Sequence, residues 1–232
     1  MYQTVNFGTY GTIEGEDRPL EYVSIVPAVH SNAPSPRGKQ LLDRLEGIFL
    51  DEGFRRVTVA ELAARLHCSR ATLYALAPSK EELFLRVLER VLGRIRRLGQ
   101  EAAAGQSNVR DRILAHMSPG MGEMQAASGV FFSDIASLPD ARRILASHQR
   151  ARREEVRAIL EEGINGGDFR GVHTSLVAEV LMVAIQRVMD PQVLAENRLS
   201  AGEAIGEIED LFLHGLLHPS ESGARKPRSV RA

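Results

Sequence analysis

Residues 69–74 combine small and polar side chains in an order that suits contact with the base pairs of DNA. In the major groove an Arg side chain can pair with guanine, and an Ala or Thr methyl group can contact the methyl group of thymine. If a helix begins after Ser69, it presents four side chains for such contacts: Arg70, Ala71, Thr72 and Tyr74. We expect these four residues to face the major groove.

Two hydroxyl residues at helix starts could add contacts with the phosphates of DNA. Thr58 and Ser69 both stand where an N-cap is expected, and Glu61 follows Thr58 at the spacing of a capping box. The free amide groups and the dipole at a helix N-terminus attract anions. Thr58 and Ser69 are therefore predicted to lie against the DNA backbone.

The element that positions these side chains is a helix-turn-helix, predicted at about residues 58–77. Apolar residues at helical spacing indicate two short helices, separated by a tight break at His67 and Cys68. A capped helix, a two-residue break and a second short helix make up the sequence pattern of this motif. We expect Cys68 to be a small core residue and not a redox sensor.

Two longer helices frame the motif. A Ser-Pro pair at residues 35–36 starts the first of them, which ends at Gly53. A second capping box starts a long helix over residues 80–102, whose Arg side chains are expected to form a solvated outer face. Residues 37–98 are thus predicted to form a three-helix DNA-binding domain, preceded by a disordered arm at residues 1–36.

The charge distribution supports a confined phosphate-binding face. The chain has a net charge of −1, but residues 37–100 carry thirteen Lys or Arg against eight Asp or Glu. A basic segment within an acidic chain is typical of proteins that bind nucleic acid through one face. Pattern and charge alone leave a second interpretation open, namely a generic helical bundle with a solvated surface.

The sequence between Phe49 and Leu83 resembles the N-terminal domain of the tetracycline-repressor (TetR) family. The matching residues keep the family's spacing without a gap; they are Phe49, Gly53, Phe54, Val57, Thr58, Val59, Leu62, Ala63, residues 69–74 and residues 78–83. The resemblance implies an all-α fold, in which an N-terminal three-helix helix-turn-helix domain precedes a C-terminal helical domain for ligand binding and dimerisation. It also implies that Lys80, at the start of the long helix, contacts a phosphate.

Three residues depart from the family pattern. His67 replaces the usual glycine of the turn, but His tolerates a left-handed backbone better than most residues. Leu76 replaces a polar residue and is expected to make no hydrogen bond to phosphate. Ala77 replaces a buried Phe and leaves a space that another side chain must fill. These changes affect the expected affinity and sequence choice, not the fold.

Residues 99–218 are predicted to form the second domain, followed by a disordered tail at residues 219–232. The expected helices cover residues 108–117, 129–137, 139–165, 174–189 and 200–217, with a break at residues 118–120. Adaptable apolar side chains and a few polar ones could line a ligand cavity in this domain. The candidates are His116, Met117, Met121, Met124, Phe131, Phe132, Ile135, His148, Met182 and Gln186. For each apolar candidate, an ordinary core position is an equally good interpretation.

The last two predicted helices are apolar on more than one side. Such a helix must be buried on more than one side, which at the end of a chain favours a subunit interface. The residues expected there are Leu181, Ile185, Val188, Ile205, Ile208, Leu211 and Phe212. The family resemblance implies the same contact, with two helices from each subunit.

The sequence therefore predicts a ligand-responsive regulator that binds a double-stranded DNA operator as a homodimer. Release by a small apolar or amphipathic molecule would make it a repressor, although activation stays open. The alternative is a helical ligand-binding or scaffold protein whose DNA-binding face has degenerated, because Leu76 and Ala77 depart from the pattern. The effector, the operator and the regulated genes are not encoded in any recognisable pattern.

Other classes find little support in the sequence. No Ser/His/Asp set, glycine-rich phosphate loop or pair of catalytic carboxylates is recognisable, so no enzyme and no cofactor are expected. His214 and His218 have the spacing of metal ligands, but no further ligand accompanies them, and no metal is expected. One Cys, no secretory signal and no apolar run longer than residues 180–185 predict a cytoplasmic protein without a membrane contact.

Overall fold

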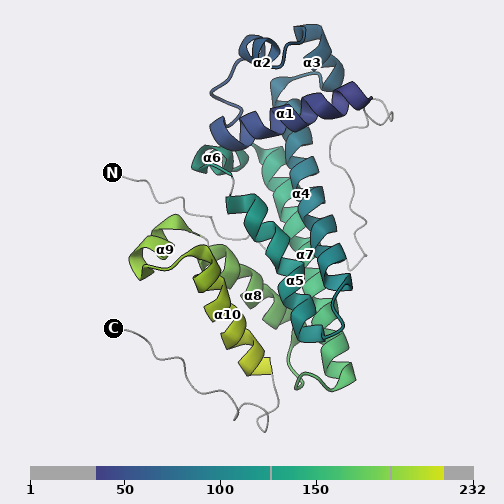
Figure 1. The fold of residues 1–232 in the computed structure, drawn as a ribbon, viewed down its shortest axis with the longest axis vertical. Coiled ribbons are helices and arrows are strands. Elements are labelled where there is room, and N and C mark those ends of the chain that lie inside the picture. Colours follow the sequence, from purple (N-terminus) through teal and green to yellow (C-terminus); the bar gives the residue numbers. More distant parts are fainter. Residues whose placement is uncertain (1–34, 126, 189, 217–232) are drawn as a thin grey trace.

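A computed structural model describes residues 35–125, 127–188 and 190–216, and the secondary structure of this part is helical, without a strand (Figure 1). The expected all-α fold is thereby confirmed. Its ten helices are α1 (Pro36–Glu52), α2 (Val59–Arg65), α3 (Arg70–Leu76), α4 (Lys80–Ala104), α5 (Val109–Gln125), α6 (Gly129–Ser137), α7 (Pro139–Gly166), α8 (Thr174–Val188), α9 (Pro191–Asn197) and α10 (Ala201–Leu216). The expected arm up to residue 34 and the expected tail at 219–232 lie outside the described residues.

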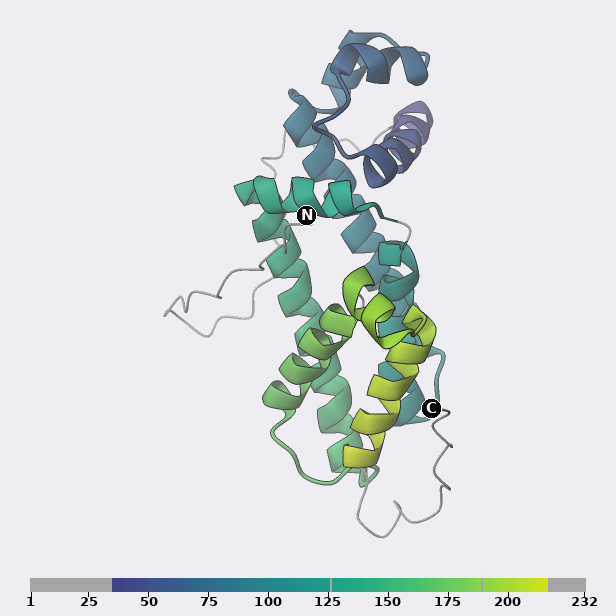
Figure 2. The same ribbon diagram turned by 90° about the vertical axis from the view of Figure 1, so that its left-hand side faces the viewer.

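The helices form an elongated molecule with α1, α2 and α3 at one end (Figure 1). The long helices α4 and α7 run along the molecular axis and pack against each other and against α5. Figure 2 shows α6 crossing the molecule beneath α1, while α8 and α10 pack together on the flank at the other end. The helix-turn-helix thus projects at one end, and α4 runs from it into the rest of the bundle.

Side-chain caps fix the starts of the first four helices. Each predicted N-cap accepts a hydrogen bond from the backbone N–H three residues later; these caps are Ser35, Thr58, Ser69 and Ser79. At the other end of α1, Gly53 has a φ of 74°, a left-handed conformation that glycine adopts without strain. The sequence therefore located the helix-turn-helix correctly because its punctuation is local.

One hydrophobic core lies beneath α1–α3 and extends into the neighbouring helices. The ring of Phe84 on α4 is its centre, stacked on Phe54 at a centroid distance of 4.6 Å and in edge contact with Phe49 and Phe131. Phe131 belongs to α6, so this core joins the helix-turn-helix to a helix far along the chain. Burial of these rings holds the end of the molecule as one packed unit.

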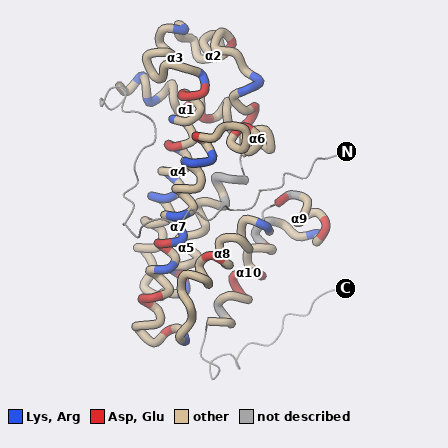
Figure 3. Tube along the Cα trace, turned by 180° about the vertical axis from the view of Figure 1, so that it is seen from behind, with Lys and Arg blue, Asp and Glu red and all other residues tan. Residues whose placement is uncertain are grey.

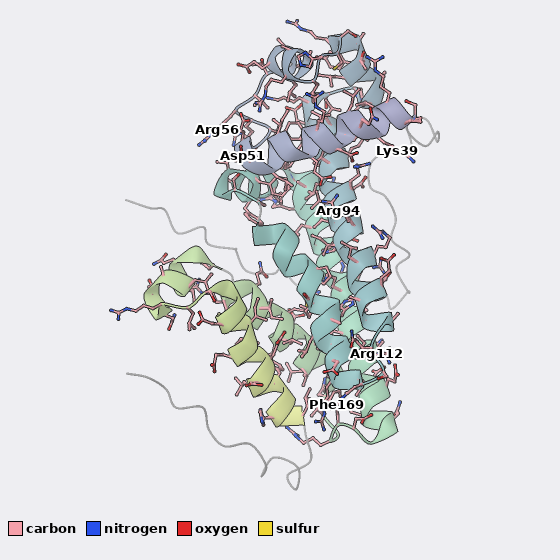
Figure 4. All side chains as sticks on the ribbon, in the orientation of Figure 1. Lys39, Asp51, Arg56, Arg94, Arg112 and Phe169 are labelled. Carbon is pink, nitrogen blue, oxygen red and sulfur yellow. The ribbon has the colours of Figure 1, made fainter. Side chains whose placement is uncertain are left out.

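A second core lies at the opposite end, between α5, α7, α8 and α10. Phe169, which follows α7, is fully buried there and its ring lies against Gly163, where any side chain would collide with it. Figure 4 shows Phe169 at the end of the bundle farthest from α2 and α3. The chain reverses tightly after α7 because Gly167 adopts a left-handed conformation with a φ of 82°.

The predicted break at residues 118–120 is wrong, since α5 continues through Pro119 to Gln125. A proline has a helical φ, so a helix can pass through it where tertiary contacts outweigh the lost hydrogen bond. Here α7 holds the segment, because Arg152 donates from Nη2 to the carbonyl oxygen of His116 at 3.3 Å and Met117 is buried in the second core. Tertiary packing thus outweighs the local signal for a break.

Residues 191–197 form a short helix that the sequence analysis missed. Asp190 caps it by accepting a hydrogen bond from the N–H of Gln192 at 2.9 Å, and Pro191 is its first residue. Proline was interpreted only as the end of the preceding helix, whereas it also favours the first position of a new one.

The outer face of α4 was expected to be solvated, but several of its arginines form ion pairs with neighbouring helices. Arg90 and Arg94 pair with Asp43 and Glu46 of α1, and Arg96 pairs with Glu155 of α7 at 2.6 Å. Basic residues of α4 therefore lie close to acidic residues of neighbouring helices (Figure 3), and Arg94 lies just beneath α1 (Figure 4). Within the described residues, no helix is long and apolar enough to cross a membrane.

Candidate nucleic-acid interface

Helix α3 presents a polar face to solvent and an apolar residue to the core. Leu73 is completely buried and anchors the helix, whereas Arg70, Ala71 and Tyr74 are exposed. Tyr74 has 48% of its surface accessible, and no ion pair engages Arg70 in the described part of the chain. The three side chains are therefore accessible to a partner as large as a DNA duplex.

The hydroxyl groups at the start of α3 are bonded to each other. Ser69 accepts a hydrogen bond from the N–H of Thr72 at 3.0 Å, and the two side-chain oxygens lie 2.8 Å apart. This arrangement engages the Thr72 hydroxyl with Ser69 at the helix start. A methyl contact with thymine suits this arrangement better than a hydrogen bond to a base.

The start of α2 forms the complete capping box that was expected. The N–H of Thr58 donates to Glu61 Oε2 at 2.7 Å, and the N–H of Glu61 donates to Thr58 Oγ1 at 3.2 Å. Hydrogen bonds from the Thr58 backbone and hydroxyl lower the pKa of the Glu61 carboxyl, which is ionised at neutral pH. A phosphate approaching Thr58 would therefore meet the Glu61 carboxylate, which already accepts from the N–H and the hydroxyl of Thr58.

The turn between α2 and α3 has the left-handed residue that the family pattern requires. His67 has a φ of 51°, which confirms that this residue takes the place of a glycine. Arg44 of α1 supports the turn by donating to the carbonyl oxygens of Arg65 at 2.8 Å and Leu66 at 3.4 Å. Arg44 thereby satisfies backbone acceptors at the end of α2, a role that the sequence did not reveal.

Lys80 has an internal partner. Its Nζ donates to the carbonyl oxygen of Val57 at 2.9 Å and lies 5.4 Å from the centre of the Phe54 ring. The ammonium group therefore fixes the residue that precedes α2, while two of its three N–H groups remain for other acceptors.

The two replaced residues at the end of α3 are packed and not left open. Ala77 is 2% exposed and has an extended backbone, and Leu76 is half-buried against the first core. Leu76 offers no polar group, as expected. The interface must therefore obtain its phosphate contacts elsewhere, and Lys39 and Arg56, which Figure 4 shows projecting from this end of the molecule, are exposed cations that the sequence analysis did not single out.

An aspartate of α6 ties the loop after α1 to the rest of the molecule. Asp134 is 2% exposed, and its Oδ2 accepts hydrogen bonds from the backbone N–H of Phe54 at 2.6 Å and of Arg55 at 3.3 Å. A side chain at Gly53 would begin 2.5 Å from the same oxygen, so a glycine is needed there for spatial as well as conformational reasons. Nothing in the sequence near residue 134 signals a contact 80 residues away.

The predicted ligand-pocket residues do not share one cavity in the described structure. Phe131 and Ile135 are buried in the first core and Phe132 packs against it, whereas Met182 packs against the second core. Gln186 is exposed, and the side chains of Met121 and Met124 lie outside the description. The described residues of the set therefore do not form one lining in this structure, and a ligand site among them stays a prediction.

A small cavity does open between α5, α7, α8 and α10, and among the described ligand-pocket candidates only Met117 lines it. Its free space for the centre of a water-sized sphere is about 10 Å³, enough for a single water molecule. The lining is apolar except for Glu209; it consists of Ile113, Leu114, Met117, Leu160, Val177, Leu181, Ile185, Glu209, Phe212 and Leu216.

His116 and His148, predicted as polar ligand contacts, belong to a buried polar cluster between α4, α5 and α7. His116 Nε2 lies 3.2 Å from Glu155 Oε2, and Glu155 Oε1 accepts from Arg96 and Gln100, both at 2.6 Å. Although burial raises the pKa of Glu155, contacts with His116, Arg96 and Gln100 lower it to about 2. Burial, followed by the charge of Arg152, lowers the pKa of His148 to about 3.

The pKa of His148 predicts a pH dependence of stability. A histidine that stays neutral when folded but takes up a proton when unfolded stabilises the fold above its unfolded pKa of 6.5, and this stability is lost as the pH falls toward 3. The groups facing the ring are Arg152, Glu155, Arg96 and His116. We expect the unfolding free energy to fall between pH 6.5 and 4.5, and to fall less steeply in His148→Gln. Equal slopes in urea titrations of both proteins would contradict this assignment.

Three of the expected dimer-interface residues face the interior of the protomer instead. Leu181, Ile185 and Ile205 are 4%, 7% and 5% exposed, because α8 and α10 pack on each other and on the second core. Val188, Ile208 and Phe212 are half-buried, and only Leu211 is strongly exposed, at 68%. The sequence pattern could not separate the face that meets α10 from the face that meets solvent.

The apolar surface that remains exposed on α8 is a different stripe. It consists of Leu176, Val180 and Val183, which are 59%, 48% and 50% exposed and recur at helical spacing. We call these three residues the α8 stripe. Leu211 on the neighbouring helix α10 is also exposed.

Comparison with known proteins finds similarity to bacterial regulators. Residues 41–87 match the family model of "Bacterial regulatory proteins, tetR family". An uncharacterized HTH-type transcriptional regulator of Bacillus subtilis, YvaF, is 23% identical over 188 residues, which cover 80% of this chain and 98% of YvaF.

Two solved structures share the fold over most of their length. A transcriptional regulator from Saccharomonospora viridis in complex with choline has a TM-score of 0.68 and 17% identity, covering 78% of this chain and 97% of its own. The TetR-family regulator PfmR from Thermus thermophilus has a TM-score of 0.57 and 24% identity, covering 77% of this chain and all of its own. With its capped helix-turn-helix, the left-handed His67 in the turn and this family match, the N-terminal part of the chain carries the helix-turn-helix domain of the TetR family of bacterial regulatory proteins.

Proposed function

We propose that the chain binds a two-fold-related DNA operator as a homodimer, with α3 in the major groove, and that a small molecule releases it. The observation that carries the proposal is the exposed face of α3, on which Arg70, Ala71 and Tyr74 stand clear of the core while Leu73 anchors the helix. A short helix with exposed polar and small residues at its start is the element that reads bases in helix-turn-helix proteins. Repression is the sign we propose.

The residues divide by the part of DNA that they would contact. Arg70 and Tyr74 would contact base edges, and Ala71 and the Thr72 methyl group would contact thymine. Phosphate contacts would come from three further residues, Thr58, Ser69 and Lys80. At Thr58 the phosphate would have to displace the Glu61 carboxylate, which accepts from the N–H and the hydroxyl of Thr58. For Lys80 the contact would use the N–H groups that the Val57 carbonyl does not occupy.

The experiment that tests the proposal is footprinting of the full-length protein on the DNA upstream of its own gene, at several salt concentrations. Specific binding should protect two half-sites about one helical turn apart, because two copies of α3 related by a two-fold axis read them. Affinity should fall steeply with salt, as phosphate contacts release counterions. Salt-insensitive or absent protection would favour the alternative of a helical scaffold protein with a degenerate DNA-binding face.

Substitutions on α3 and α4 should have different signatures. Arg70→Ala should weaken operator binding by about 1–3 kcal/mol and relax the preference for one base pair, because it removes a base contact. Lys80→Ala should weaken binding to all sequences and lower the salt slope, because it removes a phosphate contact.

Lys80→Met is the matched variant. It removes the same ammonium group as Lys80→Ala but keeps the aliphatic part beside Phe54, so it separates the loss of charge from the loss of packing. Fluorescence anisotropy on operator and random DNA measures both affinities. Unchanged operator affinity of Arg70→Ala would show that α3 does not read bases.

The dimer is proposed to form through the α8 stripe and Leu211. The three large apolar side chains of the stripe form an exposed patch on one helix face, and such patches mark interaction sites. Burial of such surface yields about 25 cal/mol per Å². Helices α8 and α10 pack against each other on one flank of the molecule, so that two copies of the pair could pack face to face (Figure 2).

The proposed path from an effector to DNA runs through α6. Helix α6 packs against α7 and also contacts the helix-turn-helix end, where Asp134 binds the loop before α2 and Phe131 packs on Phe84 of α4. The N–H of Ser128, just before α6, also donates to the carbonyl of Leu50 at 2.8 Å. A ligand that shifts α6 would therefore move α1 and the motif with it.

A further inference from the structure

The buried polar cluster between α4, α5 and α7 contains a guanidinium group without a carboxylate partner. Arg152 is 9% exposed, and no ion pair engages it within the described residues. Its hydrogen bonds go to the carbonyl oxygen of His116 at 3.3 Å and to the sulfur of Met117 at 3.5 Å, which are both uncharged acceptors. Burial lowers the pKa of Arg152, but an arginine remains charged in proteins.

The carboxylate of Glu155 is already engaged. Glu155 binds Arg96 and Gln100 through Oε1, while its Oε2 faces His116. Glu155 thus gives its hydrogen bonds to other residues and not to Arg152. A buried charge is costly unless it is paired, so an anion beside Arg152 would compensate its charge.

A second polar group beside Arg152 also lacks a partner. His148 lies one helical turn earlier on α7, on the same face, and is 4% exposed. Its Nδ1 is buried without a hydrogen-bond partner. The ring is neutral at neutral pH because burial and the charge of Arg152 depress its pKa, and a neutral imidazole can donate one hydrogen bond.

The space for the guanidinium depends on a glycine of α5. A side chain at Gly120 would collide with Arg152 Nη1, so the turn after Pro119 lies close against the charged group. Met117, one turn earlier, touches Arg152 and also lines the apolar cavity between α5, α8 and α10. The cationic group and the apolar cavity are therefore adjacent, with Met117 between them.

We propose that the effector is an amphipathic anion whose carboxylate or similar group binds between Arg152 and His148, while its apolar part enters the cavity beyond Met117. This inference rests on the proposed response to a small molecule and names its chemical class. The cavity as it stands holds about one water molecule, so binding must widen it by separating the helices that line it. A cationic ligand such as the choline named for the Saccharomonospora viridis structure would be repelled by the unpaired Arg152.

Calorimetry on the full-length protein without DNA tests the proposal with three ten-carbon probes: decanoate, 1-decanol and decyltrimethylammonium. We expect decanoate to bind most tightly, because it alone supplies a negative charge. Arg152→Met should weaken decanoate binding roughly 10- to 100-fold, the range for loss of a hydrogen bond to a charged group, and change 1-decanol binding little. Arg150→Met, an exposed arginine of the same helix, is the matched control and should bind all probes as the wild type does.

Two further readings separate a binding role from a structural one. Ligand-free Arg152→Met should unfold at the same temperature as the wild type or higher, since it removes an uncompensated buried charge. Arg152→Lys, which retains the charge without the planar fork, should recover part of the decanoate affinity.

The proposal is overturned if the wild type prefers the ammonium probe or the alcohol, or if no alkanoate from hexanoate to hexadecanoate binds. Equal decanoate affinity in wild type and Arg152→Met also overturns it. Because these measurements contain no DNA, they are independent of operator release. Decanoate that binds at Arg152 but leaves an operator complex intact would refute the proposed response and not the site.

Discussion

Val180→Arg is expected to turn the proposed dimer into folded monomers. Val180 is half-exposed in the protomer, so an arginine there is compatible with the fold of one chain. In an interface built on the α8 stripe the same side chain would be buried without a partner, at a cost of several kcal/mol. The dissociation constant should rise by at least about 100-fold. Light scattering at micromolar concentration measures it.

Operator binding should decline with the dimer. Two half-sites are bound together only while two copies of α3 are held at a fixed spacing, and a monomer has only one copy of α3. Leu199→Arg is the control, because Leu199 is an exposed apolar residue outside the stripe. A Val180→Arg protein that stays dimeric would show that the subunits meet through another surface.

The comparison with Leu181→Arg separates the two possible interfaces on α8. Leu181 is 4% exposed and lies in the second core, so an arginine there should unfold the protomer instead of dividing a dimer. The sequence analysis placed Leu181 in the interface because its helix is apolar on several sides. It could not tell which apolar side α10 of the same chain covers, since that depends on packing between distant segments.

Local signals in the sequence were reliable where the physics is local. The N-caps of α1–α4 depend on side chains within three residues of the amide groups that they bind, and the left-handed turn depends on His67 itself. These features located the helix-turn-helix and the exposed residues of α3. The same approach failed at Pro119, where contacts from α7 let the helix continue.

Sites formed by distant segments were beyond the sequence. His116 and His148 were recognised as candidates, but their partners Arg96, Arg152 and Glu155 were not, because these residues look like solvent-facing charges on amphipathic helices. A charged residue on a helix surface is recognisable as buried only when the neighbouring helix is known. The phenylalanines of α6 were likewise assigned to a cavity and are packed in a core.

Asp134→Ala should loosen helices α1–α3 from the rest of the bundle. The carboxylate accepts hydrogen bonds from the N–H groups of Phe54 and Arg55, and its removal leaves the Phe54 amide buried without a partner. Such a loss costs about 1–3 kcal/mol, which for a chain of this size lowers the unfolding temperature by roughly 2–4 °C per kcal/mol. Thermal unfolding and hydrogen exchange at the two amides measure the effect.

Two variants show whether the effect comes from this contact. Asp134→Asn keeps an acceptor oxygen but not the charge, and should lie between the wild type and Asp134→Ala, since charge-assisted hydrogen bonds are the stronger ones. Ser133→Ala changes an exposed neighbour on α6 and should have no effect. Unaltered exchange at Phe54 in Asp134→Ala would mean that the carboxylate does not hold the loop.

The effect of Asp134→Ala on DNA should exceed its effect on stability. The loop that Asp134 holds runs directly into Val57 and the cap of α2, and Lys80 binds the Val57 carbonyl from the other side. Without its contact to α6, the helix-turn-helix of each subunit would sample a wider range of orientations. A dimer whose two helix-turn-helix motifs vary in spacing binds a fixed pair of half-sites less well. Operator affinity should therefore fall even at temperatures where Asp134→Ala is fully folded, whereas binding to random DNA, which needs no fixed spacing, should change little.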